Sequence, residues 1–548
     1  MKLSASIIAA GIMAFTSAEA STLLYNINGF TMEDGKLKQF SAIEYDEGKV
    51  LRTFKEANPD INADERMDGE GRTVLPGLID THGHISWHGR ALSSVDLIGA
   101  ADEKEAQDRV REFVGRPNSN GWLWGRGWNQ EHWPTKEFPT KETLDALTTD
   151  IAIVLNRIDG HAVWVNSKTL ELVGIDRNTP EPQGGQILKD ENGEPTGVLV
   201  DTAMNLVYEV MPENDHETLQ EEIMIALNDM VSLGTTSAHD AGIKSDEVRA
   251  MLALREKEIM PARVYAMLDI LDASNDQYLE AGIITDNKAM MEIRAVKILS
   301  DGAMGSRGAA MLEDYTDSHG YRGDMLFKPE EMEHHMVRAM AHGFQVNTHA
   351  IGDRANREVL DMYERLQDEP LRRKMRHRVE HAQIIDADDI LRFKELGVAA
   401  SIHPTHATSD MGMVETRIGM ERVEEGGYAW RTLWESGAHL GGGSDFPVEP
   451  VNPFYGLHAV ITSQDRDGNP LDGWMPNQTL NREQAFDLFT AKAAFLGHQE
   501  NEIGQLSPGY WADFIILDRN YFEIPAEDIW KIKVVKTFVA GKEVYSAN

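Results

Sequence analysis

The chain has 548 residues, enough for a large hydrophobic core and more than one domain. Its 41% hydrophobic and 26% charged residues are ordinary for a globular protein, whereas the formal net charge of −37 argues against nucleic acid or an anionic membrane as the main partner. The sequence contains no cysteine, which excludes disulfides, thiolate metal sites, iron–sulfur clusters and cysteine nucleophiles. Any metal must therefore be held mainly by histidine and carboxylate side chains.

The first 20 residues are similar to a secretory signal peptide. Lys2 supplies a minimal positive end, residues 3–16 are mostly apolar or small, and residues 18–20 (AEA) match an A-x-A cleavage site. A buried N-terminal helix is the alternative, because one lysine is a weak positive region. No later stretch has the roughly 18 uninterrupted apolar residues of a membrane span. We therefore expect a periplasmic or secreted protein without a stable membrane anchor.

Both ends of the mature chain read as short strands and turns. Residues 21–72 are hairpin-like, and strand-like runs recur at residues 513–517, 534–539 and 541–545. Two strand-rich ends around a long middle predict one discontinuous β-sandwich domain. We assign it residues 21–73 and 500–548.

The middle of the chain alternates strand-like runs with helix-period segments, the pattern of a parallel α/β architecture. Eight such runs predict a (β/α)8 or TIM barrel over residues 74–499. A tryptophan-rich and hairpin-like interruption at about residues 95–215 predicts an inserted substrate or lid subdomain. The runs are residues 74–82, 234–240, 263–269, 293–300, 344–349, 377–381, 397–403 and 439–445.

Several of these runs contain or end in potential metal ligands. His82 and His84 flank Gly83 at the end of the first run, so in a strand they would project side by side. Taken singly, each candidate has an ordinary explanation, such as a snorkelling lysine, a core histidine or a helix cap. In a barrel, however, the carboxyl ends of all strands form one active-site face. The converging set is His82, His84, Lys297, His349, His381 and Asp445.

A longer collinear series of motifs makes the pattern more specific, and on it the chain resembles the metal-dependent amidohydrolase superfamily, in its YtcJ-like, N-substituted formamide deformylase-like branch. The resemblance covers nearly the whole mature chain. The motifs are LPGLIDTHGH (75–84), GRGWNQEHWP (125–134), DGHAVWVNS (159–167), VKILSDGAMGSR (296–307), THAIGDRA (348–355), HRVEHAQ (377–383), GGGSDFPVEP (441–450) and SPGYWADFIILD (507–518).

The resemblance implies a centre with two divalent metal ions. By the family pattern, His82 and His84 bind one ion, and His349 and His381 bind the second. Lys297 matches the lysine that is carboxylated to bridge both ions. The chemistry agrees, because a lysine in a dry, doubly cationic pocket is pushed toward its neutral amine, which can add carbon dioxide.

Asp445 matches the carboxylate of the eighth strand, which binds metal and handles protons. Two adjacent ions would lower the pKa of a shared water, and Asp445 would orient the metal-bridging hydroxide, take its proton and return it to the leaving nitrogen. Zinc is the default ion for a histidine-rich site, with iron and manganese as alternatives.

Three further residues are candidates for contact with substrate. Trp128 belongs to a segment with four tryptophans, an aromatic wall or else the core of the insertion. His161 of the DGH motif would hydrogen-bond the substrate carbonyl or its oxyanion, or else tie the insertion to the barrel. Arg307 would meet a substrate carboxylate, or else form an ordinary ion pair. Four more groups at strand ends receive no role: His239, Asp240, His403 and His406.

Together these features predict a metal-dependent amidohydrolase that cleaves a C–N bond other than a peptide bond. The substrate class would be an amide, formamide or cyclic amide of a small molecule. The barrel and the metal ligands do not determine which substrate bond is hydrolysed, so an esterase or lactonase is the alternative. A non-catalytic periplasmic binding or regulatory protein is disfavoured because every expected ligand is present. The sequence names neither the substrate nor the oligomeric state, and a homo-oligomer is compatible with it.

Overall fold

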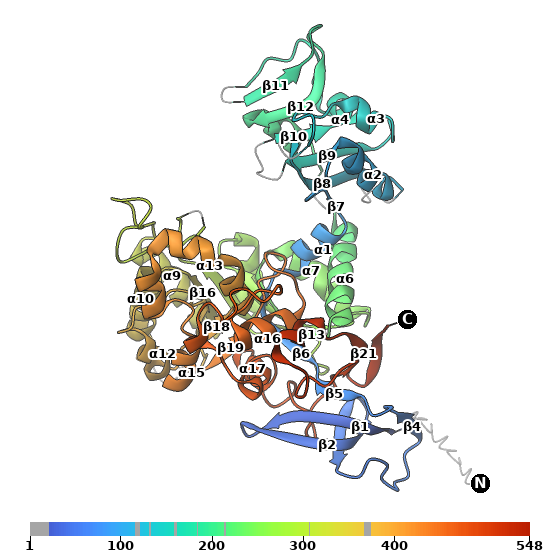
Figure 1. Cartoon of the computed structure of the whole chain (residues 1–548), viewed down its shortest axis with the longest axis vertical. Coiled ribbons are helices and arrows are strands. Elements are labelled where there is room, and N and C mark those ends of the chain that lie inside the picture. The colour runs from blue at the N-terminus through green and yellow to red at the C-terminus, as the bar shows by residue number, and fades with distance from the viewer. Residues whose placement is uncertain are drawn as a thin grey trace, which may run out of the picture.

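The computed structural model describes residues 21–547 except 116–120, 131–132, 158–161, 183–184, 213–214, 306 and 367–373, with backbone alone at 201–202. Three sheets organise the chain: one built from both termini, one that curves into a barrel, and one in the inserted segment (Figure 1). The predicted signal peptide, residues 1–20, lies outside the described residues. Within the described part, no helix is both long and apolar enough to cross a bilayer.

Strands from both ends of the chain form one hydrogen-bonded sheet, in the order β22-β21-β20-β5-β1-β2-β3, with β4 beside β1. The junction of the two ends is the antiparallel pair β5–β20, in which Pro76 faces Phe514. The strands are β1 (Thr22–Glu33), β2 (Lys36–Asp46), β3 (Lys49–Phe54), β4 (Glu65–Asp68), β5 (Thr73–Pro76), β20 (Phe514–Leu517), β21 (Val534–Val539) and β22 (Lys542–Ser546).

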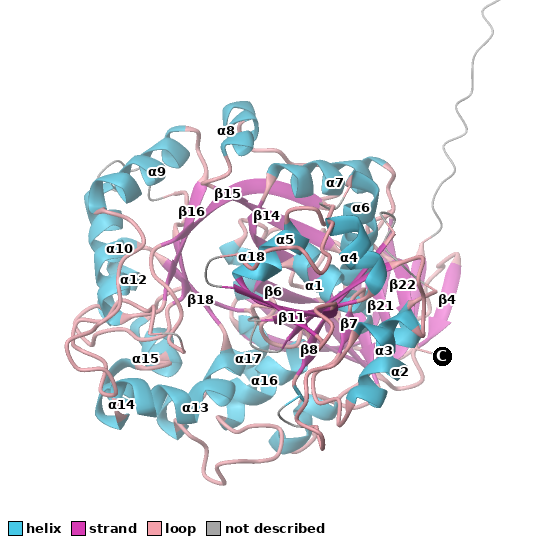
Figure 2. Ribbon diagram, turned by 90° about the horizontal axis from the view of Figure 1, so that it is seen from above, coloured by secondary structure: helices cyan, strands magenta, loops and turns pink. Residues whose placement is uncertain are grey.

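Eight parallel strands form the barrel, which confirms the predicted fold class (Figure 2). The first and eighth strands meet where Asp445 N donates to His82 O at 2.8 Å and His84 N donates to Phe446 O at 2.8 Å. The strands are β6 (Leu78–Gly83), β13 (Thr235–Ile243), β14 (Arg263–Asp269), β15 (Met291–Leu299), β16 (Gln345–Ala350), β17 (Arg378–His381), β18 (Ala399–Ile402) and β19 (Leu440–Gly442).

The predicted first strand, residues 74–82, is two strands instead of one. The chain leaves the terminal sheet after β5 and enters the barrel as β6, with Gly77 between them. A Cβ atom at Gly77 would lie 2.1 Å from Thr236 Oγ1, so only glycine lets the two segments approach this closely. Pro76-Gly77 is therefore the crossing point between the two domains.

Helices cover the outside of the barrel and bury their apolar faces on it (Figure 2). They are α1 (Ile85–Leu92), α6 (His216–Ser232), α7 (Ser245–Glu256), α8 (Asp276–Ala281), α9 (Pro329–Ala341), α10 (Asp353–Leu366), α12 (Ile390–Leu396), α13 (Pro404–Ile418), α14 (Met420–Gly426), α15 (Trp430–Ser436), α16 (Pro453–Thr462), α17 (Arg482–Leu488) and α18 (Ala491–Leu496).

The inserted segment forms its own sheet between α1 and α6 and projects away from the barrel (Figure 1). Two apolar clusters pack within this insertion, so it has a core of its own. Its elements are β7 (Val95–Asp96), α2 (Glu103–Phe113), β8 (Trp122–Trp128), α3 (Lys141–Asp145), β9 (Ala152–Arg157), β10 (Ala162–Val165), α4 (Ser167–Val173), β11 (Gly185–Lys189), β12 (Pro195–Asp201) and α5 (Asn205–Tyr208).

Candidate metal centre

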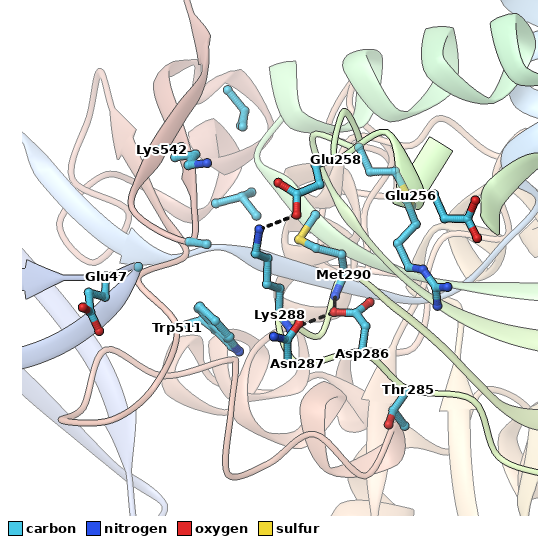
Figure 3. Close-up of a pocket in the computed structure, with 16 residues that line it drawn as sticks. Glu47, Glu256, Glu258, Thr285, Asp286, Asn287, Lys288, Met290, Trp511 and Lys542 are labelled. Atoms are coloured by element: carbon cyan, nitrogen blue, oxygen red, sulfur yellow. Dashed lines mark hydrogen bonds and ion pairs between the residues drawn. The ribbon is translucent and has the colours of Figure 1, made fainter. Parts of the chain in front are cut away.

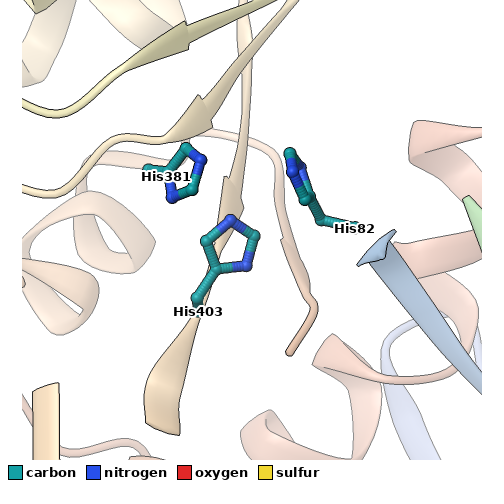
Figure 4. Close-up of side chains that lie close together, drawn as sticks. All are labelled: His82, His381 and His403. Atoms are coloured by element: carbon teal, nitrogen blue, oxygen red, sulfur yellow. The ribbon is translucent and has the colours of Figure 1, made fainter. Parts of the chain in front are cut away.

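The carboxyl ends of the barrel strands bring histidine and aspartate side chains to one point. Three overlapping groups each have potential ligand atoms within 4.8 Å of one another. The rings of one such group face each other in Figure 4. The groups are His82 with His84 and Asp445, His82 with His381 and His403, and His381 with His406 and Asp445.

Lys297 reaches this point from β15, the fourth barrel strand. Its Nζ lies 3.1 Å from His82 Nε2, and the residue is 5% exposed. Burial lowers the pKa of Lys297, against the opposing effect of the nearby Glu380 and Asp445 carboxylates. The lysine is thus biased toward the neutral amine, the form that carboxylation requires.

His82 is oriented by a buried ion pair inside the barrel. Its Nδ1 lies 2.5 Å from Glu380 Oε2, and Arg378 Nε donates to Glu380 Oε1 at 2.8 Å. Arg378 and Glu380 are two residues apart on β17, so their side chains share one face of the strand and both point inward. Because Nδ1 is engaged by a carboxylate, Nε2 is left for a metal ion. This carboxylate–histidine contact is absent from the sequence prediction, although the quoted motifs HRVEHAQ and LPGLIDTHGH contain Glu380 and His82.

Asp445 stands between the histidines at the rim. One carboxylate oxygen lies 3.2 Å from His84 Nε2 and 3.5 Å from His82 Nε2. Burial by itself raises the pKa of Asp445, but the hydrogen bond with His84 and the imidazoles of His406 and His403 outweigh it and hold that pKa well below its usual range. Asp445 is therefore an ionised carboxylate, the form that binds metal and accepts a proton.

Two residues of the centre have left-handed backbone conformations, His381 with φ 73° and Asp445 with φ 62°. A non-glycine residue in this region is strained by about 1–3 kcal/mol. His381 ends β17 and Asp445 follows β19, so the turn at each position redirects its side chain toward the common centre. Such strain is typical of functional sites.

His349 borders the centre without joining the three ligand groups. Its ring centroid lies 4.4 Å from that of His381, and its Nε2 lies 3.4 Å from Asp301 Oδ1. Asp301 in turn accepts hydrogen bonds from the backbone N–H groups of Ala310, Ile351 and Gly352. Asp301 thus braces the loops beside His349.

The structure gives positions to the four groups that the sequence left without roles. His403 and His406 join the centre, from the end of β18 and the first turn of α13. His239 Nδ1 pairs with Arg378 at 2.8 Å, and Asp240 accepts from Ile85 N at the start of α1. The signal for His403 was present in the sequence, because it ends a predicted barrel strand.

The two candidate substrate residues that the structure describes, Arg307 and Trp128, have partners away from the centre. Arg307 makes a bidentate ion pair with Asp317, at 3.0 and 2.8 Å. Trp128 is fully buried in the core of the insertion, where its Nε1 donates to Leu155 O at 2.8 Å. His161 lies outside the described residues. An ion pair therefore accounts for the contacts of Arg307, and core packing accounts for those of Trp128.

A cavity of about 410 Å³ opens over the centre, a size typical of small-molecule sites. One part of its wall is apolar, from Leu299, Met304, Ile351, Met413 and Val448. Its remaining polar lining includes Gln383, Ser409, Asp410 and Glu449.

A second cavity, of about 440 Å³, lies between the terminal sheet and the barrel (Figure 3). There Lys288 pairs with Glu258 beside Trp511 and Lys542. It adjoins the starts of β14 and β15, the end of a barrel that serves stability rather than catalysis. We therefore place the reaction at the metal centre.

The donor set fits divalent metal ions. Burial is the largest of the causes that lower the pKa values of His82, His381 and His403 well below the ordinary imidazole value, so these rings are neutral. Ring nitrogens of His349, His381, His403 and His406 have no hydrogen-bond partner in the part of the chain that the structure describes. Neutral imidazoles beside an ionised carboxylate are the ligands that zinc and related ions prefer.

Comparisons with known proteins agree with this geometry. Residues 65–545 match the Amidohydrolase family. The chain is 31% identical to the putative amidohydrolase YtcJ of Bacillus subtilis (strain 168), over 88% of this chain and 91% of that protein. It is 25% identical to the N-substituted formamide deformylase of Arthrobacter pascens, over 87% and 89% of the two chains.

A solved structure, an uncharacterised metal-dependent hydrolase from Pyrococcus horikoshii OT3, matches with a TM-score of 0.75 and 27% identity, over 92% of this chain and 99% of that one. The shared fold places the strand-end histidines in the setting of a metal-dependent hydrolase. The chain therefore belongs to the amidohydrolase family of metal-dependent hydrolases, in its YtcJ-like branch.

Proposed function

We propose that this hydrolase cleaves a C–N bond other than a peptide bond, in an amide, formamide or cyclic amide of a small molecule. The observation that carries the proposal is the meeting of the Lys297 amine, the His82 ring and the Asp445 carboxylate at the floor of the cavity. The similarity to a protein named N-substituted formamide deformylase supports a C–N bond.

The residues of the centre would hold two divalent ions, with zinc as the default. His82, His84 and Asp445 form one ligand group, and the family pattern assigns His349 and His381 to the second ion. Lys297, once carboxylated, would bridge the two. When bound, such ions lower the pKa of a water and polarise a substrate carbonyl.

Asp445 is the proton carrier in this proposal. As an ionised carboxylate beside His84, it accepts the proton of the attacking water. It then returns that proton to the substrate nitrogen as the C–N bond breaks, so a neutral amine leaves and a carboxylic acid remains. Glu380 supports the step indirectly, because it holds His82 in one tautomer.

The cavity lining favours an uncharged or amine-bearing substrate with an apolar group. Its apolar wall would cover that group, and the Asp410 and Glu449 carboxylates would repel a substrate carboxylate. Arg307, the group expected to bind such a carboxylate, is paired with Asp317 instead.

Export is a further part of the proposal. The positive end, apolar run and A-x-A motif of residues 1–20 support secretion or a periplasmic location. Mass spectrometry of protein recovered from a bacterial periplasm should then give an N-terminus at Ser21. An intact Met1 on the native protein would contradict it.

The decisive test is a hydrolysis screen of the zinc-loaded mature chain. Formamides, N-acyl amines, N-acyl amino acids and lactones are compared at equal concentration. We expect C–N cleavage that a chelator abolishes and added zinc restores, with at least a 100-fold loss in Asp445→Asn. Asp388→Asn, at an exposed carboxylate, should behave like wild type. Cleavage of lactones alone, or a folded metal-free protein from metal-replete cells, would overturn the proposal.

A further inference from the structure

His403 is the most completely isolated imidazole of the centre. It is 3% exposed, and neither of its ring nitrogens has a hydrogen-bond partner among the described residues. A buried polar group without a partner costs free energy, so such groups usually mark the place of a bound water, an ion or a functional contact. The ring needs a partner that the protein does not supply.

His403 lies beside two other histidines of the centre, so the missing partner is expected on the side that the three rings share. Its ring centroid lies 4.5 Å from that of His381 and 4.7 Å from that of His82. Ligand atoms of these three rings fall within 4.8 Å of one another (Figure 4). Two nitrogens on one tetrahedral zinc ion lie about 3.4 Å apart, so small side-chain rotations would let two neighbouring rings of this group share an ion.

The contacts of His82 indicate which of the two metal ions His403 could bind. His82 has only Nε2 to offer, because Glu380 engages Nδ1. That nitrogen already belongs with His84 and Asp445, which form their own ligand group. His381 is then the ring left to share a second ion with His403.

A small space borders both of these rings. A cavity of about 10 Å³ lies among His381, His403, His406 and three neighbouring side chains, and it has room for one atom-sized occupant.

We infer that His403 is a ligand of the second metal ion, supplied by the seventh barrel strand beside His381. This inference rests on the proposed metal centre, and the experiment below separates the two.

Metal binding to His403→Gln tests the inference directly. Cobalt(II) is titrated into the metal-free protein against a competing chelator, and the visible absorption bands report the coordination of each ion. We expect the affinity for one of the two ions to fall by more than the roughly 10–100-fold typical of an outer contact, with altered bands for that ion. His381→Gln should affect the same ion.

A matched control is His458→Gln. His458 is a buried imidazole, 2% exposed, on α16 and outside the three ligand groups. It should bind two cobalt ions with wild-type affinity and spectrum. Unchanged cobalt binding in His403→Gln, together with weakened binding in His82→Gln and His381→Gln, would overturn the inference alone. Unchanged binding in all three would overturn the metal centre as well.

Crystals of the wild-type protein grown with zinc remove any dependence on the folding of a variant. An anomalous peak about 2.0–2.1 Å from a His403 ring nitrogen is the expected result. Two zinc peaks that both lie beyond about 3 Å from that ring would exclude ligation. A water in the small cavity gives no anomalous peak, so that occupant would also count against the inference.

Discussion

The amine of Lys297 and the ring of His82 lie 3.1 Å apart, although 215 residues separate them in the chain. They approach because β15 and β6 are the fourth and first strands of one barrel, with their carboxyl ends at the same face. Burial lowers the pKa of Lys297, so this nitrogen is the group at the centre that can change from cation to anionic ligand by adding carbon dioxide.

Replacement of Lys297 by alanine should therefore remove the bridge between the two metal sites. We expect Lys297→Ala to retain less than two ions per chain and to lose at least about 100-fold in activity. Short carboxylates such as acetate should restore part of the activity, because they can occupy the space of a carbamate. Metal analysis and kinetics check this, with exposed Lys36→Ala as control. Full metal content without Lys297 would rule out the bridging role.

The effect of the Glu380–His82 contact on metal binding can be measured separately from its effect on the stability of the fold. Glu380→Gln breaks its buried pair with Arg378 and should destabilise the protein by about 3–5 kcal/mol. It should also weaken metal binding by roughly 10–100-fold, because His82 loses its orienting carboxylate. Chemical denaturation and chelator competition measure the two effects.

The matched control is another buried ion pair, between Arg263 and Asp513, at 2.6 and 2.8 Å. This pair joins the barrel to the terminal sheet and lies at the amino end of β14. Asp513→Asn should destabilise the protein to a similar degree while metal affinity stays at the wild-type value. Equal losses of metal affinity in both variants would mean that the effect of Glu380 is only structural.

Stability should decline in mild acid in part through His458. Burial lowers the pKa of this imidazole to about 4, against an ordinary value near 6.5, with a smaller opposing effect from Asp465. Between these values the unfolded chain binds the proton and the folded chain does not. The free energy of unfolding should therefore fall by up to about 3 kcal/mol as the pH drops from 7 to 4.

Denaturation curves across this pH range give the measurement. His458→Gln should show a shallower decline than wild type, because it lacks the titrating group. Exposed His216→Gln should keep the wild-type slope. Identical slopes in wild type and His458→Gln would show that this imidazole is not buried neutral.

The charge of the cavity wall should appear in substrate preference. Glu449→Gln removes one carboxylate from the lining, and we expect kcat/KM for N-acyl amino acids to rise about two- to fivefold. Values for neutral amides of the same acyl group should change little, because no charge is repelled. A pairwise comparison of the two substrate series measures this. Equal changes in both series would point to a steric effect instead.

Much of the fold follows from local pattern. The alternation of strand-like and helical segments predicts the barrel, and β14 begins and ends where the sequence places it. The first strand differs, because the break at Gly77 depends on Thr236, a residue of another strand. Hydropathy along the chain carries no information about such a partner.

The site also has residues that the sequence could identify and contacts that it could not. His82, His84 and Asp445 could be chosen because each stands at the end of a predicted strand. The partners of Arg307 and Trp128 could not be predicted, since a charged or aromatic residue is equally compatible with substrate contact and with the ion pair or core packing observed.

The order of residue types along the chain by itself determined the barrel class and the set of side chains able to face its carboxyl end. Only the tertiary structure decided which of them meet, including Glu380 behind His82 and His403 beside His381. The physical reason is that strand periodicity is a local property of the backbone, whereas contacts across the barrel depend on closure and register between segments hundreds of residues apart.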